Sequence, residues 1–86
     1  MGRRQKNIMI TLINLRKKGN IIEADYYHED KKNELGHFKY DINKGKYIEV
    51  KYAGGSKQYG FIHIENDLKL LIRHNVFPEK RVILWY

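Results

Sequence analysis

The sequence predicts an α+β domain in which a four-stranded antiparallel β-meander, one helix and a C-terminal strand form two layers. Three observations support this fold class. Apolar and polar residues alternate in short segments that are separated by turn-forming residues. A stretch with apolar residues at three- and four-residue spacing follows. After Pro78, the chain ends in a segment without a polar residue, 82–86.

Length and composition limit what the chain can be. Its 86 residues are enough for one domain, which we place at residues 8–86, after a disordered basic tail at residues 1–7. The absence of cysteine rules out disulfides and thiolate metal sites and suits a reducing cytoplasm, which is the expected location. No apolar run approaches the ~20 residues that span a bilayer, and no signal peptide or membrane contact is expected.

The first half of the domain reads as a β-hairpin. Residues 8–15 are rich in aliphatic and β-branched side chains, which favour a strand, and residues 17–20 contain Gly19 and form a turn. Residues 21–28 form the return strand, with one buried and one solvated face. Its two faces are Ile22, Ala24 and Tyr26 against Glu23 and Asp25.

A second hairpin follows a charged loop. Residues 35–42 alternate as Phe38, Tyr40 and Ile42 against His37, Lys39 and Asp41. The turn at residues 43–45 has the glycine that a short hairpin requires. Alternation in residues 46–52 predicts Ile48, Val50 and Tyr52 facing inward and Tyr47, Glu49 and Lys51 facing outward.

The helix is predicted from Ser56, a suitable N-cap, to residue 74 or 75, with Gly60 inside it. Its core-facing stripe is Phe61, Ile64, Leu68, Leu71 and Ile72. Pro78 prevents the helix from continuing. Residues 61–64 alone would also suit a strand, but the stripe as a whole favours a helix.

The apolar segment 82–86 needs apolar neighbours on both faces, so it belongs in the interior of a sheet or under a dimer partner. We place it beside the first strand, whose two faces are also both apolar. These faces are Ile8, Ile10 and Leu12 against Met9, Ile13 and Leu15.

The excess of positive charge lies near the N-terminus. Six cations and no acid occur in residues 1–18, so this stretch accounts for +6 of the net +7 and leaves +1 for residues 19–86. Such a cluster is either a solvated tail and turn or a nucleic-acid contact, since phosphate binding needs several cations on one surface. Aromatic residues make up 13% of the chain, and strand tyrosines beside lysines could stack on single-stranded bases. The candidate contacts are Arg3, Arg4, Arg16, Lys17, Lys18, Tyr27, Lys39, Tyr47 and Lys51.

Catalytic and metal motifs are not found. Ser56 is the only serine and Thr11 the only threonine, and neither lies in a nucleophile motif. The helical pair His63 and Asp67 is typical of a surface hydrogen bond, and a metal site at the loop between His28 and His37 is disfavoured. Residues 54–57 resemble a phosphate-binding loop but lack its spacing. No catalytic residue, metal or cofactor is therefore expected.

One resemblance concerns the C-terminal part of the chain. The arrangement of His63, then Phe77-Pro78-Glu79, then the closing Trp85-Tyr86 resembles a loose group of small, uncharacterised bacterial proteins. In that group a histidine-bearing helix precedes a Phe-Pro-Glu turn, a short strand and a terminal Trp-Tyr. The residue after the histidine is commonly alanine there and is Ile64 here. The resemblance implies a compact, strand-rich domain and no established activity.

These features favour a small, non-catalytic protein-interaction module that binds a protein partner or itself. The candidate interface residues are Ile62 and Leu70, which lie off the core stripe of the helix, and Ile83 and Trp85 in the terminal strand. The alternative is a nucleic-acid-binding accessory protein that uses the basic N-terminal cluster and the strand tyrosines.

Overall fold

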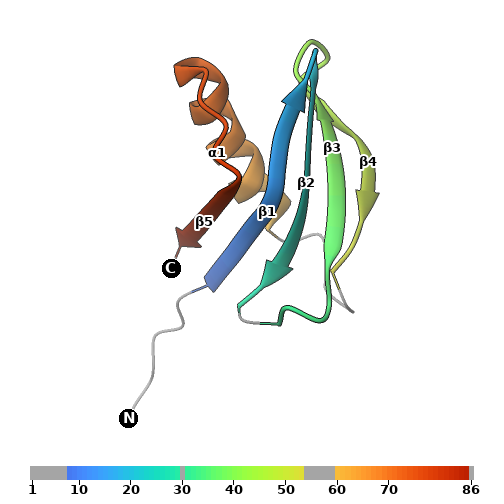
Figure 1. The fold of residues 1–86 in the computed structure, drawn as a ribbon, viewed down its shortest axis with the longest axis vertical. Helices are drawn as coiled ribbons and strands as arrows, with labels where there is room; N and C mark the ends of the chain where they lie inside the picture. Colours follow the sequence, from blue (N-terminus) through green and yellow to red (C-terminus); the bar gives the residue numbers. More distant parts are fainter. Residues whose placement is uncertain (1–7, 30, 54–59, 86) are drawn as a thin grey trace.

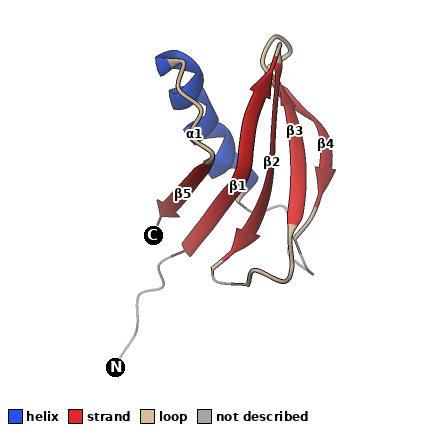
Figure 2. Cartoon of the chain, viewed as in Figure 1, coloured by secondary structure: helices blue, strands red, loops and turns tan. Residues whose placement is uncertain are grey.

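The computed structural model describes residues 8–29, 31–53 and 60–85. They form one five-stranded antiparallel sheet with the strand order β4-β3-β2-β1-β5, and helix α1 lies across one face (Figures 1 and 2). The elements are β1 (Ile8–Lys18), β2 (Ile21–His28), β3 (Gly36–Asp41), β4 (Lys46–Lys51), α1 (Phe61–His74) and β5 (Lys80–Trp85). The α+β class, the four-stranded meander and the pairing of the terminal strand with the first strand are confirmed.

Helix α1 is shorter at its start than predicted. It begins at Phe61, and Gly60 is its N-cap with a φ of 130°, a conformation that a side chain strongly disfavours. The predicted cap Ser56 lies outside the described residues. The helix ends where expected, at Asn75 in a left-handed conformation whose N–H donates to Ile72 and Leu71 carbonyl oxygens. The strand alternative for residues 61–64 is wrong.

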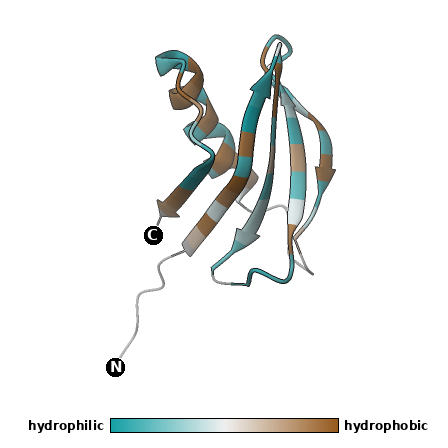
Figure 3. Cartoon of the chain, viewed as in Figure 1, coloured by the Kyte–Doolittle hydropathy of each residue, from teal (hydrophilic) through white to brown (hydrophobic). Residues whose placement is uncertain are grey.

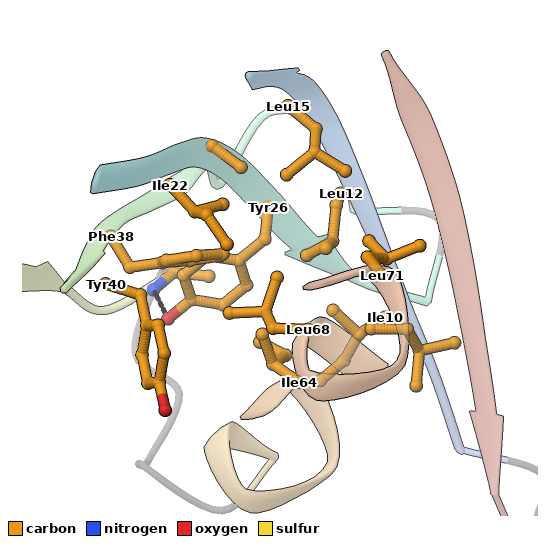
Figure 4. Packing of buried hydrophobic residues seen from close by; sticks show 13 residues of the cluster. Ile10, Leu12, Leu15, Ile22, Tyr26, Phe38, Tyr40, Ile64, Leu68 and Leu71 are labelled. Atoms are coloured by element: carbon orange, nitrogen blue, oxygen red, sulfur yellow. Dashed lines mark hydrogen bonds between the residues drawn. The ribbon is translucent and has the colours of Figure 1, made fainter. Parts of the chain in front are cut away.

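The core lies between α1 and the sheet. Ile64, Leu68 and Leu71 are buried and point toward the sheet, as the helical stripe predicted (Figure 4). The sheet meets them with alternate residues of β1, β2, β3 and β5, here called the inner face. Its buried members are Ile10, Leu12, Leu15, Ile22, Ala24, Tyr26, Phe38, Tyr40 and Ile83. In the described part of the chain, no element covers the opposite, outer face.

A β-bulge changes the facing of residues in β1. Ile13 pairs with Asp25 and Arg16 pairs with Glu23, so two residues of β1 lie opposite one residue of β2. Asn14, with a φ of 56°, takes up the extra length. Leu15 is consequently buried against the helix, and its predicted place on the face of Met9 and Ile13 is wrong.

A second bulge has the same effect in β4. Tyr47 pairs with Tyr40 and Glu49 pairs with Lys39, which leaves Ile48 without a cross-strand partner. Tyr47 therefore turns to the inner face, where its ring packs edge-on against Phe61 with centroids 5.1 Å apart. The side chain of Ile48 is 47% exposed. The predicted outward Tyr47 and inward Ile48 are both wrong, because alternation breaks at a bulge.

Tyrosine hydroxyls connect the inner face of the sheet to other parts of the chain. Tyr40 donates to Glu65 at 2.9 Å, and Tyr47 donates to the Phe61 carbonyl oxygen at 2.6 Å. Burial, followed by the hydrogen bond and charge of Glu65, raises the pKa of Tyr40 to about 12. Burial likewise raises the pKa of Tyr47. These hydroxyls stay protonated and hold the first turns of α1 on the sheet.

Tyr26 makes the most deeply buried of these contacts. Its hydroxyl accepts a hydrogen bond of 3.0 Å from the N–H of Ala53, drawn as the dashed line in Figure 4. The ring passes over Gly36, where an added Cβ would lie 2.6 Å from the Lys51 carbonyl oxygen and from the Ala53 nitrogen. Glycine is therefore required at the start of β3 for this hydrogen bond to form.

Strand β5 is an edge of the sheet. It pairs with β1 alone among the described strands, from Ile8 opposite Trp85 to Ile13 opposite Lys80. The predicted position in the sheet interior is wrong. The other predicted environment, beneath a dimer partner, stays a prediction. Figure 3 shows the apolar stretch of β5 beside the apolar first half of β1.

Candidate protein-interaction surface

The outer face of the sheet has a polar half, built from rows of side chains that cross the strands. One row runs Arg16, Glu23, Lys39 and Glu49, in register from β1 to β4. Charges alternate along it, with N···O distances of 3.0 Å between Arg16 and Glu23 and 3.6 Å between Lys39 and Glu49. Opposite charges on directly opposed residues stabilise a sheet modestly and keep this half suited to water.

His37 is held between two carboxylates in the same polar half. Its Nε2 lies 2.9 Å from Glu23 and its Nδ1 lies 2.7 Å from Asp25. These two contacts fix the orientation of the imidazole ring. Burial raises the pKa of Asp25, but hydrogen bonds from His37 and Asn14 and the nearby cations outweigh burial, so the pKa lies below its usual value.

The groups around His37 are arranged differently from the ligands of a metal ion. The two carboxylates contact opposite nitrogens of one ring, so their oxygens do not converge on a common point with a ring nitrogen. Over residues 8–29, 31–53 and 60–85 the structure contains no group of three or more His, Asp or Glu side chains placed to bind a metal ion. A shallow, open depression of about 410 Å³ lies beside the bulge of β1, lined by Asn14, Leu15, Arg16, Asp25 and Glu79.

The remaining corner of the outer face is apolar. Val82 and Leu84 of β5 alternate with the buried Ile83, so they project from the outer face, and their side chains are 47% and 57% exposed. They pair with Thr11 and Met9 of β1, which are buried and half-buried, respectively. We call the outer-face residues Met9, Ile13, Val82 and Leu84 the β1–β5 patch. It is continuous with the free edge of β5.

Backbone hydrogen bonding shows which groups of β5 point to that edge. The N–H of Glu29 donates to the Met9 carbonyl at 2.8 Å, so Met9 and alternate residues of β1 direct their backbone groups toward β2. Ile8, Ile10 and Leu12 then bond to β5, at their partners Trp85, Ile83 and Arg81. The N–H and C=O groups of Lys80, Val82 and Leu84 consequently point away from β1. They offer donors and acceptors to another strand.

The two edges of the sheet differ in their protection against such pairing. Edge strand β4 contains the bulge at Ile48, begins at Lys46 and ends at Lys51. Bulges and edge lysines are the features by which natural sheets discourage added strands. Strand β5 has two cations at its start and then an unbroken apolar run. Among the strands that the structure describes, only the β5 edge is open to a partner strand in this sense.

The predicted interface residues are distributed over three positions. Ile62 and Leu70 are exposed on α1, as predicted. Ile83 is buried in the core, and Trp85 pairs with Ile8 at the end of the β1–β5 ladder. The exposed apolar residues Val82 and Leu84 of β5 were missed. Their facing depends on which side of β5 the helix covers, which an entirely apolar segment does not reveal.

The predicted nucleic-acid contacts do not form one surface. Arg16 and Lys39 are engaged in the charge row, while Lys17, Lys18 and Lys51 are exposed. Tyr47 faces the helix and Tyr27 is only 6% exposed, so neither ring stands in solvent, as base stacking would require. Arg3 and Arg4 lie outside the described residues.

The fold places His28 and His37 on opposite faces of the sheet. His28 is buried on the inner face, where burial lowers its pKa, whereas His37 lies on the outer face. Asp67, the predicted partner of His63, forms two hydrogen bonds of 2.8 Å with the guanidinium of Arg81. This bidentate pair fastens α1 to β5.

Comparisons of the chain with known protein families, with curated proteins and with solved structures find no match. Within the described residues, no helix has the length and apolar character that a membrane crossing requires. Function is therefore inferred from the geometry and the charges of the chain itself.

Proposed function

We propose that the chain is a small, non-catalytic protein-interaction module whose binding surface is the β5 edge together with the β1–β5 patch. It binds by strand addition. A protein strand pairs with the free backbone groups of β5 and covers the exposed side chains of Val82 and Leu84.

One observation carries this proposal. The β4 edge of the sheet has features that disfavour pairing with an added strand, whereas the β5 edge does not. The bulge and the lysines of β4 discourage pairing there, while β5 combines unpaired backbone groups with an apolar surface. The polar half of the outer face is internally paired, so binding energy is concentrated at the β5 corner.

Site-specific photocrosslinking in the native cell tests the proposal. A photoreactive residue is placed at Leu84 in one variant and at Glu49, on the guarded β4 edge, in another. Protein adducts of defined mass are expected from position 84 and not from position 49. Combining the Leu84 label with Val82→Pro should abolish the adducts, because proline removes an edge donor and leaves the ladder to β1 intact.

The negative results are equally specific. Absence of protein adducts from position 84, in a cell where the labelled chain is folded and abundant, would contradict the proposed function. Adducts that persist in the Val82→Pro variant would show that contact there does not involve strand pairing. Adducts with nucleic acid in place of protein would favour the second candidate below.

A second candidate, nucleic-acid binding, is supported by the position of two hairpin tips. The β1–β2 and β3–β4 turns lie at the same end of the sheet (Figure 1), and Lys18, Ile21, Asp41 and Lys46 are in register across it. This gathers four exposed lysines around one acid, Asp41. Across residues 8–29, 31–53 and 60–85, none of these lysines forms an ion pair: Lys17, Lys18, Lys44 and Lys46.

Binding of fluorescent single-stranded DNA and RNA at two salt concentrations tests this candidate. The double variant Lys44→Ala/Lys46→Ala should weaken binding and reduce the slope of log affinity against log salt by about 1.4 if both lysines contact phosphates. Its matched control is Lys31→Ala/Lys32→Ala, which removes the same charge from the β2–β3 loop at the opposite end. Equal effects of the two double variants would indicate only non-specific attraction to a basic protein.

A further inference from the structure

We propose that the strand added to β5 is β5 of a second copy of this chain, antiparallel to the first and centred on Ile83. This inference rests on the proposed function and names its partner. The result is a two-fold symmetric dimer with a continuous ten-stranded sheet. A two-fold axis between antiparallel strands is perpendicular to the sheet, so both helices lie on the same face and flank the seam.

The direction of the backbone groups permits two main registers. Because Val82 and Leu84 point their N–H and C=O groups to the free edge, the hydrogen-bonded pairs of a β5–β5 ladder must come from these residues and Lys80. A ladder centred on Ile83 pairs Val82 of each copy with Leu84 of the other. A ladder centred on Val82 instead pairs Lys80 with Leu84 and Arg81 with Ile83.

Side-chain chemistry favours the register centred on Ile83. It puts the exposed apolar side chains of Val82 and Leu84 directly beside each other on the outer face and joins the two β1–β5 patches. On the inner face, Ile83 meets Ile83 of the second copy. The register centred on Val82 instead puts Lys80 opposite Leu84 on the outer face, so that only the two Val82 side chains meet there.

Charge placement also suits a second copy, despite the net charge of +7. In the register centred on Ile83, the two Lys80 residues are six positions apart along the seam, about 20 Å at ~3.4 Å per residue. That separation exceeds the screening length of about 8 Å at physiological ionic strength. The nearer cation, Arg81, is already paired with Asp67 of its own chain. Like charges therefore do not meet across the seam.

The helix extends the same surface. Asp67 faces β5, because its carboxylate bonds to Arg81, and Leu70 lies three residues later on the same flank of α1. Leu70 is 42% exposed. With both helices on one face, Leu70 of each copy faces the seam from above. The flank of α1, the edge of β5 and the β1–β5 patch thus form one self-complementary surface.

The mass of the purified full chain in solution, measured by light scattering and sedimentation at about 100 µM, tests the inference. We expect twice the 10.4 kDa of one chain. Val82→Pro should raise the dissociation constant at least about 30-fold, equivalent to about 2 kcal/mol for two lost hydrogen bonds. The control Ile62→Glu, which changes an exposed apolar residue of α1 away from the seam, should leave the dimer intact.

Single cysteines report the register, since the chain has none of its own. In the proposed register, Ile83 faces its copy as a non-hydrogen-bonded pair with Cα atoms about 4.5 Å apart, within reach of a disulfide. Ile83→Cys should therefore oxidise to a covalent dimer far more readily than Val82→Cys. The reverse preference would place the centre at Val82 and overturn the proposed register. If Ile83→Cys does not fold, a mixed disulfide between Val82→Cys and Leu84→Cys copies supplies the same information, because these two residues pair only in the register centred on Ile83.

The outcomes separate this inference from the proposed function. A wild-type mass of 10.4 kDa at 100 µM overturns the second copy as partner. In that case, crosslinks from position 84 that are lost in Val82→Pro would still support strand addition by a different protein. A dimer whose dissociation constant is unchanged by Val82→Pro would use another surface and would also overturn the inference.

Discussion

The role inferred for the strand tyrosines changes from base stacking to core packing once their environment in the fold is known. On strands beside lysines, they were compatible with base stacking in the sequence. In the structure, Tyr26, Tyr40 and Tyr47 place their rings in the core and their hydroxyls on defined partners beyond the sheet. A tyrosine suits this position because it contributes apolar area and still satisfies a polar group at the far side of the core.

Replacing Tyr26 by Phe should reduce the free energy of unfolding by about 1–3 kcal/mol, because the N–H of Ala53 loses its acceptor in a buried site. Urea denaturation at neutral pH measures the change. Tyr27→Phe is the matched control, since Tyr27 is also buried but its hydroxyl has no hydrogen bond among the described residues. A loss at Tyr26 no greater than that at Tyr27 would contradict the role given to the Tyr26 hydroxyl.

The elements were predicted better than the facing of their residues. The hairpins, the core stripe of α1 and the pairing of the terminal strand follow from alternation, turn residues and helical spacing, which are local signals. The two bulges are not local in this sense. Asn14 and Ile48 are accommodated because the flanking residues pair with neighbouring strands, so alternation read from the chain alone misplaces Leu15 and Tyr47.

Bulges predict an unusual tolerance of single deletions. Removing Ile48 should regularise β4 and keep Tyr47 inward and Glu49 outward, at a cost below about 2 kcal/mol. Removing Ala24 from the regular strand β2 should instead turn half of its residues to the wrong face and abolish cooperative unfolding. Circular dichroism during thermal unfolding compares the two deletions. Similar losses in both would show that β4 does not accommodate the missing residue.

At the scale of the whole molecule, the candidate surface was only partly predictable. The apolar terminal segment was recognisable in the sequence, and its side chains were expected to need apolar neighbours on both faces. The structure supplies these neighbours on the inner face, where Ile83 is buried in the core. The distinction between an open and a guarded edge depends on strand order, which comes from long-range pairing between residues 8–13 and 80–85. For the same reason, the sequence alone did not show that the lysine-bearing β1–β2 and β3–β4 turns lie at the same end of the sheet.

The buried tyrosines also predict how stability of the whole fold depends on alkaline pH. Tyr40 has a pKa of about 12 in the fold against 10 when unfolded, so its contribution is complete below pH 10 and is lost as the pH rises toward 12. Each such tyrosine removes up to about 1.4 kcal/mol per pH unit in this window. Urea denaturation between pH 8 and 11.5 should show this decline, and Tyr40→Phe should decline less steeply. Parallel curves would contradict the raised pKa.

The unequal edges of the sheet also limit how far it can grow. Joining two copies at β5 consumes the open edge of each, so both outer margins of the enlarged sheet are β4 strands with their bulges and lysines. An added chain would find no template there, so the proposed dimer would be closed at two copies and would not extend into a fibre.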